Sequence, residues 1–131
     1  MTEVARGLDN VGVAVRDLDA SLRFYHDAVG LPVADRDDAS RAASLSAGGA
    51  QLYVFETSGP GGTRRTGEYT RNPTGLDHLS FAVDDVDATH RQLSGRGVEF
   101  FMDPVDAEWG ARVCACHDPD GTPVYFLKWN E

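Results

Sequence analysis

The sequence predicts an α+β fold made of two tandem βαβββ modules, which form a cup-shaped, roughly eight-stranded mixed sheet with the helices outside. Three observations predict it: an internal repeat, strand-like alternation at the start of each copy, and an aspartate after each of these strands that can cap a helix. The chain has 131 residues, the size of one compact domain. We expect a single domain over 1–131, with a first module over 8–56, a linker or lid over 57–75 and a second module over 76–129.

The internal repeat carries most of this prediction. Residues 8–20 read LDNVGVAVRDLDA, and residues 76–88 read LDHLSFAVDDVDA. A shift of 68 positions (76 − 8) aligns the two segments, and most of the pairs that are not identical are conservative. The identical pairs are Leu8/Leu76, Asp9/Asp77, Ala14/Ala82, Val15/Val83, Asp17/Asp85, Asp19/Asp87 and Ala20/Ala88.

In the first copy, valines at alternate positions of 11–15 indicate a strand. Asp17 or Asp19 then caps a helix near 18–29, which ends at Gly30. Three further strands are expected near 31–36, 41–47 and 50–56, the last two joined by a tight turn at Gly48-Gly49.

The second copy repeats this order. Apolar residues alternate over 79–83, and Asp85 or Asp87 caps a helix near 86–95. The segment Asp118-Pro-Asp-Gly121 is typical of a turn, because proline fixes φ and glycine accepts positive φ. The expected strands lie near 98–101, 111–117 and 122–128.

The alternation of apolar residues also shows which residues lie on the opposite face of the first strand in each copy. The residues on that face are small or polar, so they leave space unfilled and predict a cavity inside the cup. The alternative interpretation is that glycine and alanine only allow close backbone packing. The inward residues are Asn10, Gly12 and Ala14 in the first copy and His78, Ser80 and Ala82 in the second.

Charge and composition exclude several partners. The net charge of −9 argues against nucleic acid and against an anionic membrane surface, both of which call for clustered lysine and arginine. No apolar run has the length of a signal or a membrane span, so we expect a cytoplasmic protein. Cys114 and Cys116 are spaced poorly for a disulfide within one strand and are expected to be ordinary strand thiols; the alternative is a metal cluster with His117.

Over nearly its whole length, the sequence resembles the vicinal oxygen chelate superfamily of glyoxalases, bleomycin resistance proteins and extradiol dioxygenases. LDNVGVAVRDLDASLRFYHDAVGLPV resembles the opening of that family, including its Ser-x-x-Phe-Tyr helix. LDHLSFAVDDVDA and EWGARVCACHDPDGTPVYFL resemble the second half. The resemblance is specific for the fold but not for the reaction, because the family includes lyases, isomerases, epimerases, dioxygenases, thiol transferases and drug-sequestering proteins.

In metal-dependent members of the family, the first strand of each unit supplies one ligand, usually histidine, and the last strand supplies a glutamate. The resemblance places these four positions on Asn10, Tyr53, His78 and Tyr125, with Gln51 as the alternative to Tyr53. Among them only His78 is a good ligand for a divalent ion, because an amide binds weakly and a phenol must first lose its proton. We therefore expect no metal and no other cofactor.

The predicted function is a metal-independent small-molecule-binding protein of the glyoxalase/bleomycin-resistance type that encloses an aromatic or polycyclic ligand. We expect ligand contacts from Asn10, Tyr53, His78, Trp109 and Tyr125, since aromatic rings offer a large contact area. The alternative is an enzyme in the same cup. It is either a metal-free isomerase, cyclase or lyase using His78 and Tyr125 for proton transfer, or a metal-dependent lyase or dioxygenase with non-standard ligands. A purely structural or regulatory role is a third possibility.

The resemblance also bears on assembly. Each βαβββ unit leaves sheet edges that need a partner, and exposed edges favour aggregation. Units of this family pair either within one chain or across two chains, and two-fold assembly is the commonest closed arrangement. We expect a homodimer.

Overall fold

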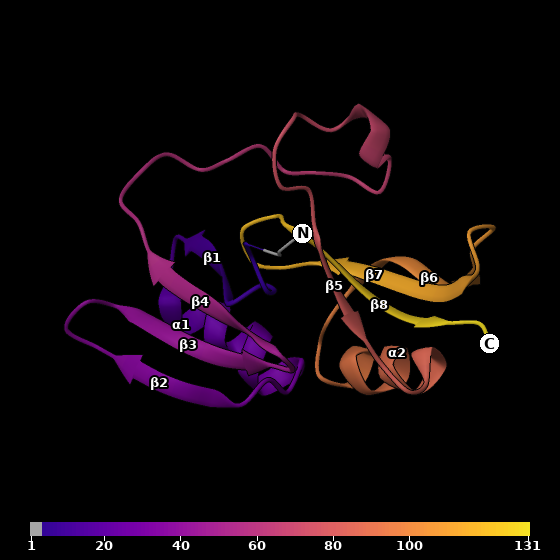
Figure 1. Ribbon diagram of the computed structural model, residues 1–131, viewed down its shortest axis with the longest axis horizontal. Coiled ribbons are helices and arrows are strands. Elements are labelled where there is room, and N and C mark those ends of the chain that lie inside the picture. Colours follow the sequence, from indigo (N-terminus) through magenta and orange to yellow (C-terminus); the bar gives the residue numbers. More distant parts are fainter. Residues whose placement is uncertain (1–3) are drawn as a thin grey trace. The chain divides into compact units, whose positions relative to one another are not determined.

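The computed structural model describes residues 4–131 and divides the chain into two compact units, Met1–Pro60 and Gly61–Glu131 (Figure 1). The boundary falls inside the expected linker. The elements of the first unit are β1 (Asn10–Val15), α1 (Leu18–Leu22), the π-helix η1 (Arg23–Ala28), β2 (Val33–Asp37), β3 (Ala42–Ala47) and β4 (Ala50–Glu56). Those of the second are the short 3-10 helix η2 (Tyr69–Arg71), β5 (Leu79–Ala82), α2 (Val86–Gly95), β6 (Phe100–Asp106), β7 (Ala111–His117) and β8 (Pro123–Trp129).

Each unit contains one four-stranded mixed sheet with the same topology. The strand orders are β1-β4-β3-β2 and β5-β8-β7-β6. In both sheets the first strand is parallel to the last, and the other neighbours are antiparallel. The structure therefore confirms the two tandem βαβββ modules that the repeat predicts.

The helices begin where the sequence places them. Asp17 caps α1 by accepting a hydrogen bond from the Ala20 N–H at 3.2 Å, and Asp85 caps α2 by accepting one from the Ala88 N–H at 3.0 Å. The first helical segment ends before Gly30, whose φ of 94° favours glycine.

The helix predicted near 18–29 is present, but only its first half is α-helical. From Arg23 the helix widens to π geometry, and the Val29 N–H donates to the Phe24 carbonyl at 2.9 Å. This widening lets two consecutive aromatic residues face the core together. Phe24 and Tyr25 are both buried, and their rings meet edge to face at 4.8 Å.

The predicted strand near 98–101 is too short. The observed β6 continues to Asp106 across Pro104, a residue that cannot donate to the hydrogen-bond ladder. Two features of β6 accommodate the proline: it is an edge strand, and its register against β7 shifts twice, between Phe100 and Met102 and again between Met102 and Val105.

The two faces of each sheet differ in burial. Along β1 and β5 the larger apolar residues are partly or fully buried, while the intervening small residues are exposed. In the second unit α2 contacts β6, β7 and β8. Phe126, Val124, Cys114 and Cys116 form the tightly buried layer of that unit, each at most 1% exposed. On the other face of the second sheet, Ser80 and Ala82 of β5 are exposed. Val113, Ala115 and Tyr125 on the same face form a second buried cluster, against which Met102, Ala107 and Leu127 pack.

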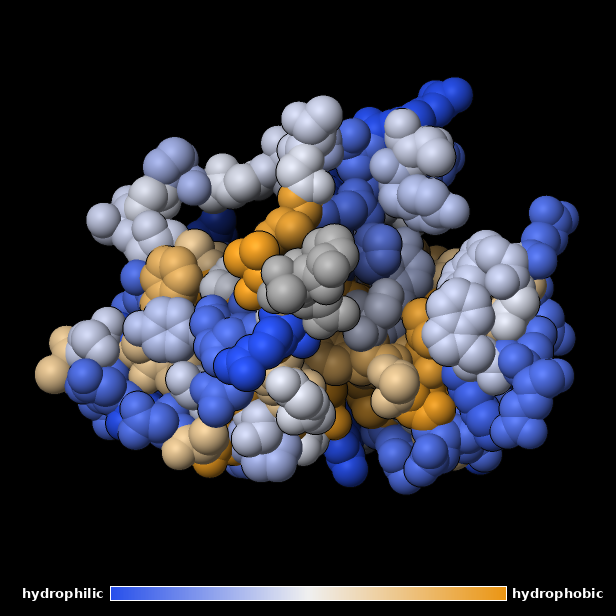
Figure 2. Space-filling model, viewed as in Figure 1, coloured by the Kyte–Doolittle hydropathy of each residue, from blue (hydrophilic) through white to orange (hydrophobic). Residues whose placement is uncertain are grey.

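Hydrophilic side chains cover much of the face seen in Figure 2, with hydrophobic residues interspersed among them, as the net charge of −9 leads us to expect. Within residues 4–131, no helix has the length and apolar character needed to cross a bilayer.

Candidate functional site

The candidate site of the second unit lies at the start of β5, on the sheet face that carries the exposed Ser80 and the buried Tyr125. His78 directly precedes that strand and is exposed with Ser80 and Ala82, while Leu79 and Phe81 are partly buried. Ser80 lies opposite Tyr125 of β8 in the parallel register. The strand phase therefore brings the imidazole and the phenol of these two chain segments to one face.

His78 is oriented by its neighbour in the sequence. Its Nδ1 lies 2.6 Å from Oδ2 of Asp77, and Oδ1 of Asp77 accepts a second hydrogen bond, at 2.7 Å, from the Asn72 amide. Burial opposes ionisation of Asp77, but the hydrogen bonds from His78 and Asn72 outweigh it and lower the pKa of the carboxyl group. An ionised Asp77 accepts the Nδ1 proton, so in the neutral imidazole Nε2 is left with its lone pair as a hydrogen-bond acceptor.

Tyr125 supplies the complementary group. Its ring centroid lies 4.6 Å from that of His78, and the residue is only 8% exposed. Burial, followed by the negative charge of Asp77 and the nearby Tyr69, raises the pKa of the phenol above its usual value. The hydroxyl therefore keeps its proton and is available as a donor beside the His78 acceptor.

Two further aromatic residues complete this cluster. Phe101 meets Tyr125 edge to face at 6.2 Å, and Tyr69 lies 6.5 Å from His78. Both are half-exposed, at 39% and 54%. His78, Tyr125, Tyr69 and Phe101 thus form a partly open aromatic surface with one fixed acceptor and one donor; we call it the His78–Tyr125 site.

The segment before β5 is held onto the second sheet by side chains. Asn72 closes a loop by donating to the Thr66 carbonyl at 3.0 Å and accepting from the Thr66 N–H at 3.2 Å. His117 at the end of β7 accepts from Arg64 at 2.9 Å and donates to the Arg65 carbonyl at 2.6 Å. Since a guanidinium has no acceptor, these bonds assign His117 to the neutral tautomer with its proton on Nε2. Both of its nitrogens are used for structure.

Two of the other predicted contacts, Asn10 and Tyr53, belong to the first unit. The Asn10 amide donates to Asp9 at 2.9 Å, and Tyr53 is 41% exposed and stacks on Phe55 at 5.6 Å. The register places Tyr53 opposite Gly12, as Tyr125 lies opposite Ser80, so it supports Tyr53 rather than Gln51 as the repeat counterpart of Tyr125.

Trp109 is separated from the His78–Tyr125 site within the second unit. It precedes β7 and packs edge to face against Trp129 at 5.2 Å. Trp129 lies four residues after Tyr125 on β8, about 13 Å along the strand. A ligand that contacts Trp109 as well as His78 would have to extend along the whole sheet.

The residues at the family's metal positions do not fit a divalent ion. An amide, two phenols and one imidazole include no carboxylate, and the proton of Tyr125 is held by burial. In the part of the chain from residue 4 onward, no group of three histidine, cysteine or acidic side chains is arranged to hold a metal. We therefore derive no chemistry through a metal here.

The cysteines are free and buried. Burial raises the pKa of Cys114 to about 11 and that of Cys116 to about 12, so both remain protonated thiols at neutral pH. The expectation of ordinary strand thiols is confirmed. Their supposed partner in a metal cluster, His117, already uses both ring nitrogens.

Sequence analysis missed the residues that orient the site. In the sequence, Asp77 was notable only as the repeat counterpart of Asp9. In the structure, each of these aspartates is hydrogen-bonded to the side chain of the next residue. Asn72 and Tyr69 come from the segment interpreted as linker and lid. Their roles depend on how this segment folds back, and no local pattern shows that.

The fold and the site geometry define a protein of two βαβββ modules with a partly exposed, aromatic sheet face. The chain belongs to the glyoxalase/bleomycin resistance protein/dioxygenase superfamily, which it matches over residues 7–126. It is 30% identical over 123 residues to the uncharacterized protein YraH of Bacillus subtilis (strain 168), covering 90% of this chain and 94% of that protein.

Solved structures agree on the fold. The crystal structure of SMU.1112c has a TM-score of 0.78 at 26% identity and covers 94% of this chain and 98% of its own. A glyoxalase/dioxygenase from Nostoc punctiforme has a TM-score of 0.80 at 19% identity and covers 100% and 99% of the two chains.

Proposed function

We propose that the chain binds a small, flat, aromatic or polycyclic molecule at the His78–Tyr125 site without the help of a metal ion. The observation that carries the proposal is the pairing of an acceptor, Nε2 of His78, with a protonated donor, the Tyr125 hydroxyl, in a partly exposed row of aromatic side chains. Aromatic walls with a few placed polar groups are typical of small-molecule sites. Contacts with Asn10, Tyr53 and Trp109 remain predictions.

The chemistry of the site favours a neutral ligand with both a donor and an acceptor group. A phenol or an amide N–H can donate to Nε2 of His78, and a carbonyl or ether oxygen can accept from Tyr125. The ionised Asp77 behind His78 makes a ligand carboxylate unfavourable there.

The test is a calorimetric or fluorescence titration against a panel of planar, natural-product-like compounds. Tyr125→Ala removes the ring, Tyr125→Phe removes only the hydroxyl, and His78→Asn installs the residue that the first repeat carries at Asn10. We expect affinity to fall about tenfold or more for each, the size of one lost hydrogen bond to a buried partner. A compound that binds all three variants like the wild type would place the site elsewhere.

Trp109→Ala is the matched control, because it removes an aromatic side chain at the distant end of the same sheet. The prediction that Trp109 contacts the ligand requires weaker binding in this variant. Unchanged binding would confine the ligand to the His78–Tyr125 site.

Metal analysis of protein purified without chelator should give well under one transition metal per chain. A stoichiometric metal that disappears on His78→Ala would contradict the proposal.

The Asp77–His78 pair favours one second candidate, an acid–base enzyme. An imidazole whose Nδ1 proton is held by a carboxylate can take a proton at Nε2, and the Tyr125 hydroxyl can donate one to a developing oxyanion. Isomerases, cyclases and lyases use such steps. If a bound compound is also converted, and if Tyr125→Phe and His78→Ala abolish turnover but retain binding, the enzyme is the correct function.

A further inference from the structure

A single histidine attaches the segment before β5 to the second sheet. We call residues 64–75 the strap; its first two residues contact His117, the last residue of β7. Nδ1 of His117 accepts from the Arg64 guanidinium at 2.9 Å, and Nε2 donates to the Arg65 carbonyl at 2.6 Å. The strap is therefore held by a side chain of the one type that ordinarily changes its charge near neutral pH.

The strap packs closely against the sheet at this point. The Arg65 N–H donates to the Gly121 carbonyl at 3.3 Å, and Gly121 has a φ of 90°. A Cβ on Gly121 would lie 3.0 Å from the Arg64 side chain, and a Cβ on Gly67 would lie 2.9 Å from the Phe101 ring. Both glycines thus allow an approach that a larger residue would disturb.

The strap carries groups that orient the His78–Tyr125 site. Asn72 donates to Asp77 at 2.7 Å, Tyr69 lies 6.5 Å from His78, and the Arg65 guanidinium donates to two later carbonyls of the strap at 3.4 and 3.5 Å. Burial opposes the ionisation of Asp77. The hydrogen bonds from His78 and Asn72, followed by the charges of His78 and Arg65, outweigh it and lower the pKa of this carboxyl group. The strap thus supports the carboxylate that orients His78.

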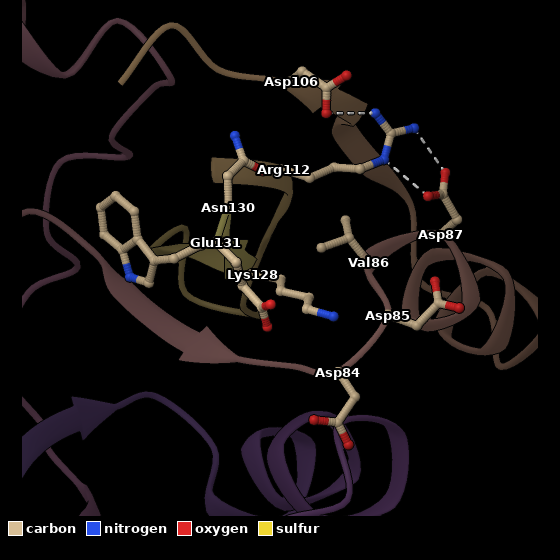
Figure 3. Close-up of a pocket in the computed structure, with 10 residues that line it drawn as sticks. Asp84, Asp85, Val86, Asp87, Asp106, Arg112, Lys128, Asn130 and Glu131 are labelled. Carbon is tan, nitrogen blue, oxygen red and sulfur yellow. Dashed lines mark hydrogen bonds and ion pairs between the residues drawn. The ribbon is translucent and has the colours of Figure 1, made fainter. Parts of the chain in front are cut away.

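The charges around His117 decide what a proton does there. Figure 3 shows how Arg112 is held elsewhere in the same unit, with Asp87 and Asp106 bound to its guanidinium. Arg64 instead donates to an uncharged ring nitrogen of His117. A proton on that nitrogen removes the acceptor of Arg64 and adds a second positive charge beside the first.

The other groups around the ring do not replace this hydrogen bond. Phe101 of β6 lies 4.6 Å from His117 between ring centroids, and Pro123 of β8 lies opposite His117 in the register; neither carries a charge. The carboxylate of Asp118, the next residue, accepts from two N–H groups of its own turn, each at 2.9 Å. Its negative charge attracts the proton, but a protonated ring still leaves Arg64 without its acceptor at Nδ1.

We propose that His117 is a pH-sensitive switch, which holds the strap on the second sheet while its imidazole is neutral and releases it when the imidazole is protonated. The bound strap requires an unprotonated Nδ1. It is therefore favoured above the ordinary titration range of histidine, about pH 6.5, and is lost as the pH falls through that range. Release takes Asn72 from Asp77 and so weakens the His78–Tyr125 site; this consequence rests on the proposed function, whereas the switch itself does not.

The switch is tested without a ligand. The Arg65 N–H donates to Gly121, so its protection from hydrogen exchange, corrected for the intrinsic effect of pH, reports on the bound strap. We expect this protection to fall about tenfold between about pH 7.5 and about pH 5.5, the effect of losing one charge-assisted hydrogen bond. The Val83 N–H, which donates to Leu127 in the same sheet at 3.0 Å, is the internal control and should keep its protection.

Three variants separate His117 from the other titrating groups. His117→Gln keeps one donor and one acceptor but does not titrate, so the Arg65 N–H should stay protected at both pH values. Arg64→Glu, at an exposed side chain, gives the protonated ring a carboxylate partner, so acid should raise the protection instead of lowering it. His78→Asn removes the other imidazole near the strap and should leave the acid-induced loss unchanged.

Wild-type protection that does not change with pH, or an acid-induced loss that persists in His117→Gln, would overturn the switch. For a compound of the binding panel that binds, affinity should fall further on acidification in the wild type than in His117→Gln, because protonation of His78 is common to both. An equal fall would overturn the control of the site by the strap. If no compound binds, only the proposed function is contradicted, and the exchange measurement still decides the switch.

Discussion

Replacing Phe126 with alanine tests the core of the second unit most sharply. Phe126 is 1% exposed on β8, on the helix-facing side of the sheet opposite to Tyr125. Its ring stacks on Phe81 at 6.0 Å and meets Phe100 at 6.4 Å. Truncation would leave a cavity bordered by both rings, which the rigid strands β5 and β8 cannot close.

We expect Phe126→Ala to lower the free energy of unfolding by about 4 kcal/mol, within the range of about 3–5 kcal/mol for buried phenylalanines. With a urea dependence of about 2 kcal/mol per molar, the unfolding midpoint falls by about 2 M. The assay is urea unfolding followed by circular dichroism.

Phe101→Ala is the matched control, because this phenylalanine also lies on the second sheet but is 39% exposed. It should cost about 1.5 kcal/mol, since only part of the ring leaves water on folding. A Phe126→Ala variant that is as stable as Phe101→Ala would refute the assignment of Phe126 to the core.

Three other predictions concern the whole chain. Cys114 and Cys116 should resist a thiol reagent in the native protein and react only after denaturation, because burial raises the pKa of both thiols; reaction at the native rate of free cysteine would contradict this. Arginine partners lower the pKa values of Asp19, Glu56 and Asp87 in the folded state. The stability that these ionised carboxylates contribute is therefore present above their unfolded pKa, near pH 4, and is lost as pH falls through their lower folded pKa values. Urea unfolding from pH 6 to pH 2 should show this loss, and high salt should reduce it; a pH-independent midpoint would be inconsistent with these ion pairs. We also predict a homodimer, since β1, β2, β5 and β6 are edge strands of their sheets. Light scattering after size exclusion at high micromolar concentration should give twice the chain mass, and the mass of one chain would contradict the prediction.

The repeat made the fold accessible from the sequence. Seven identical residue pairs at one spacing, with alternating apolar residues at the start of each copy, predicted that one structural unit occurs twice. The capping aspartates located the starts of both helices. The errors occurred where packing overrides local pattern. The π-helix at Arg23–Ala28 follows from burying Phe24 beside Tyr25, and Pro104 lies inside β6 because an edge strand does not need its N–H.

The candidate site was only partly predictable. The strand phase predicted that His78 shares a face with Ser80 and Ala82, and the family resemblance added Tyr125, which the register places on that face. The partners that set the chemistry of these two residues, Asp77 and Asn72, depend on how the segment before β5 folds back, which no periodicity encodes. For the same reason the sequence did not show that Trp109 pairs with Trp129.

The most direct measurement of the central claim is the ¹⁵N NMR spectrum of the His78 imidazole, recorded with and without a saturating compound from the binding panel. In its neutral form, the imidazole of the free protein should show a protonated Nδ1, held by Asp77, and an unprotonated Nε2. On binding, the Nε2 resonance should move as it accepts the hydrogen bond of the ligand, while the Nδ1 resonance stays nearly constant. A compound that saturates the protein and leaves both nitrogen resonances of His78 unchanged would contradict the account.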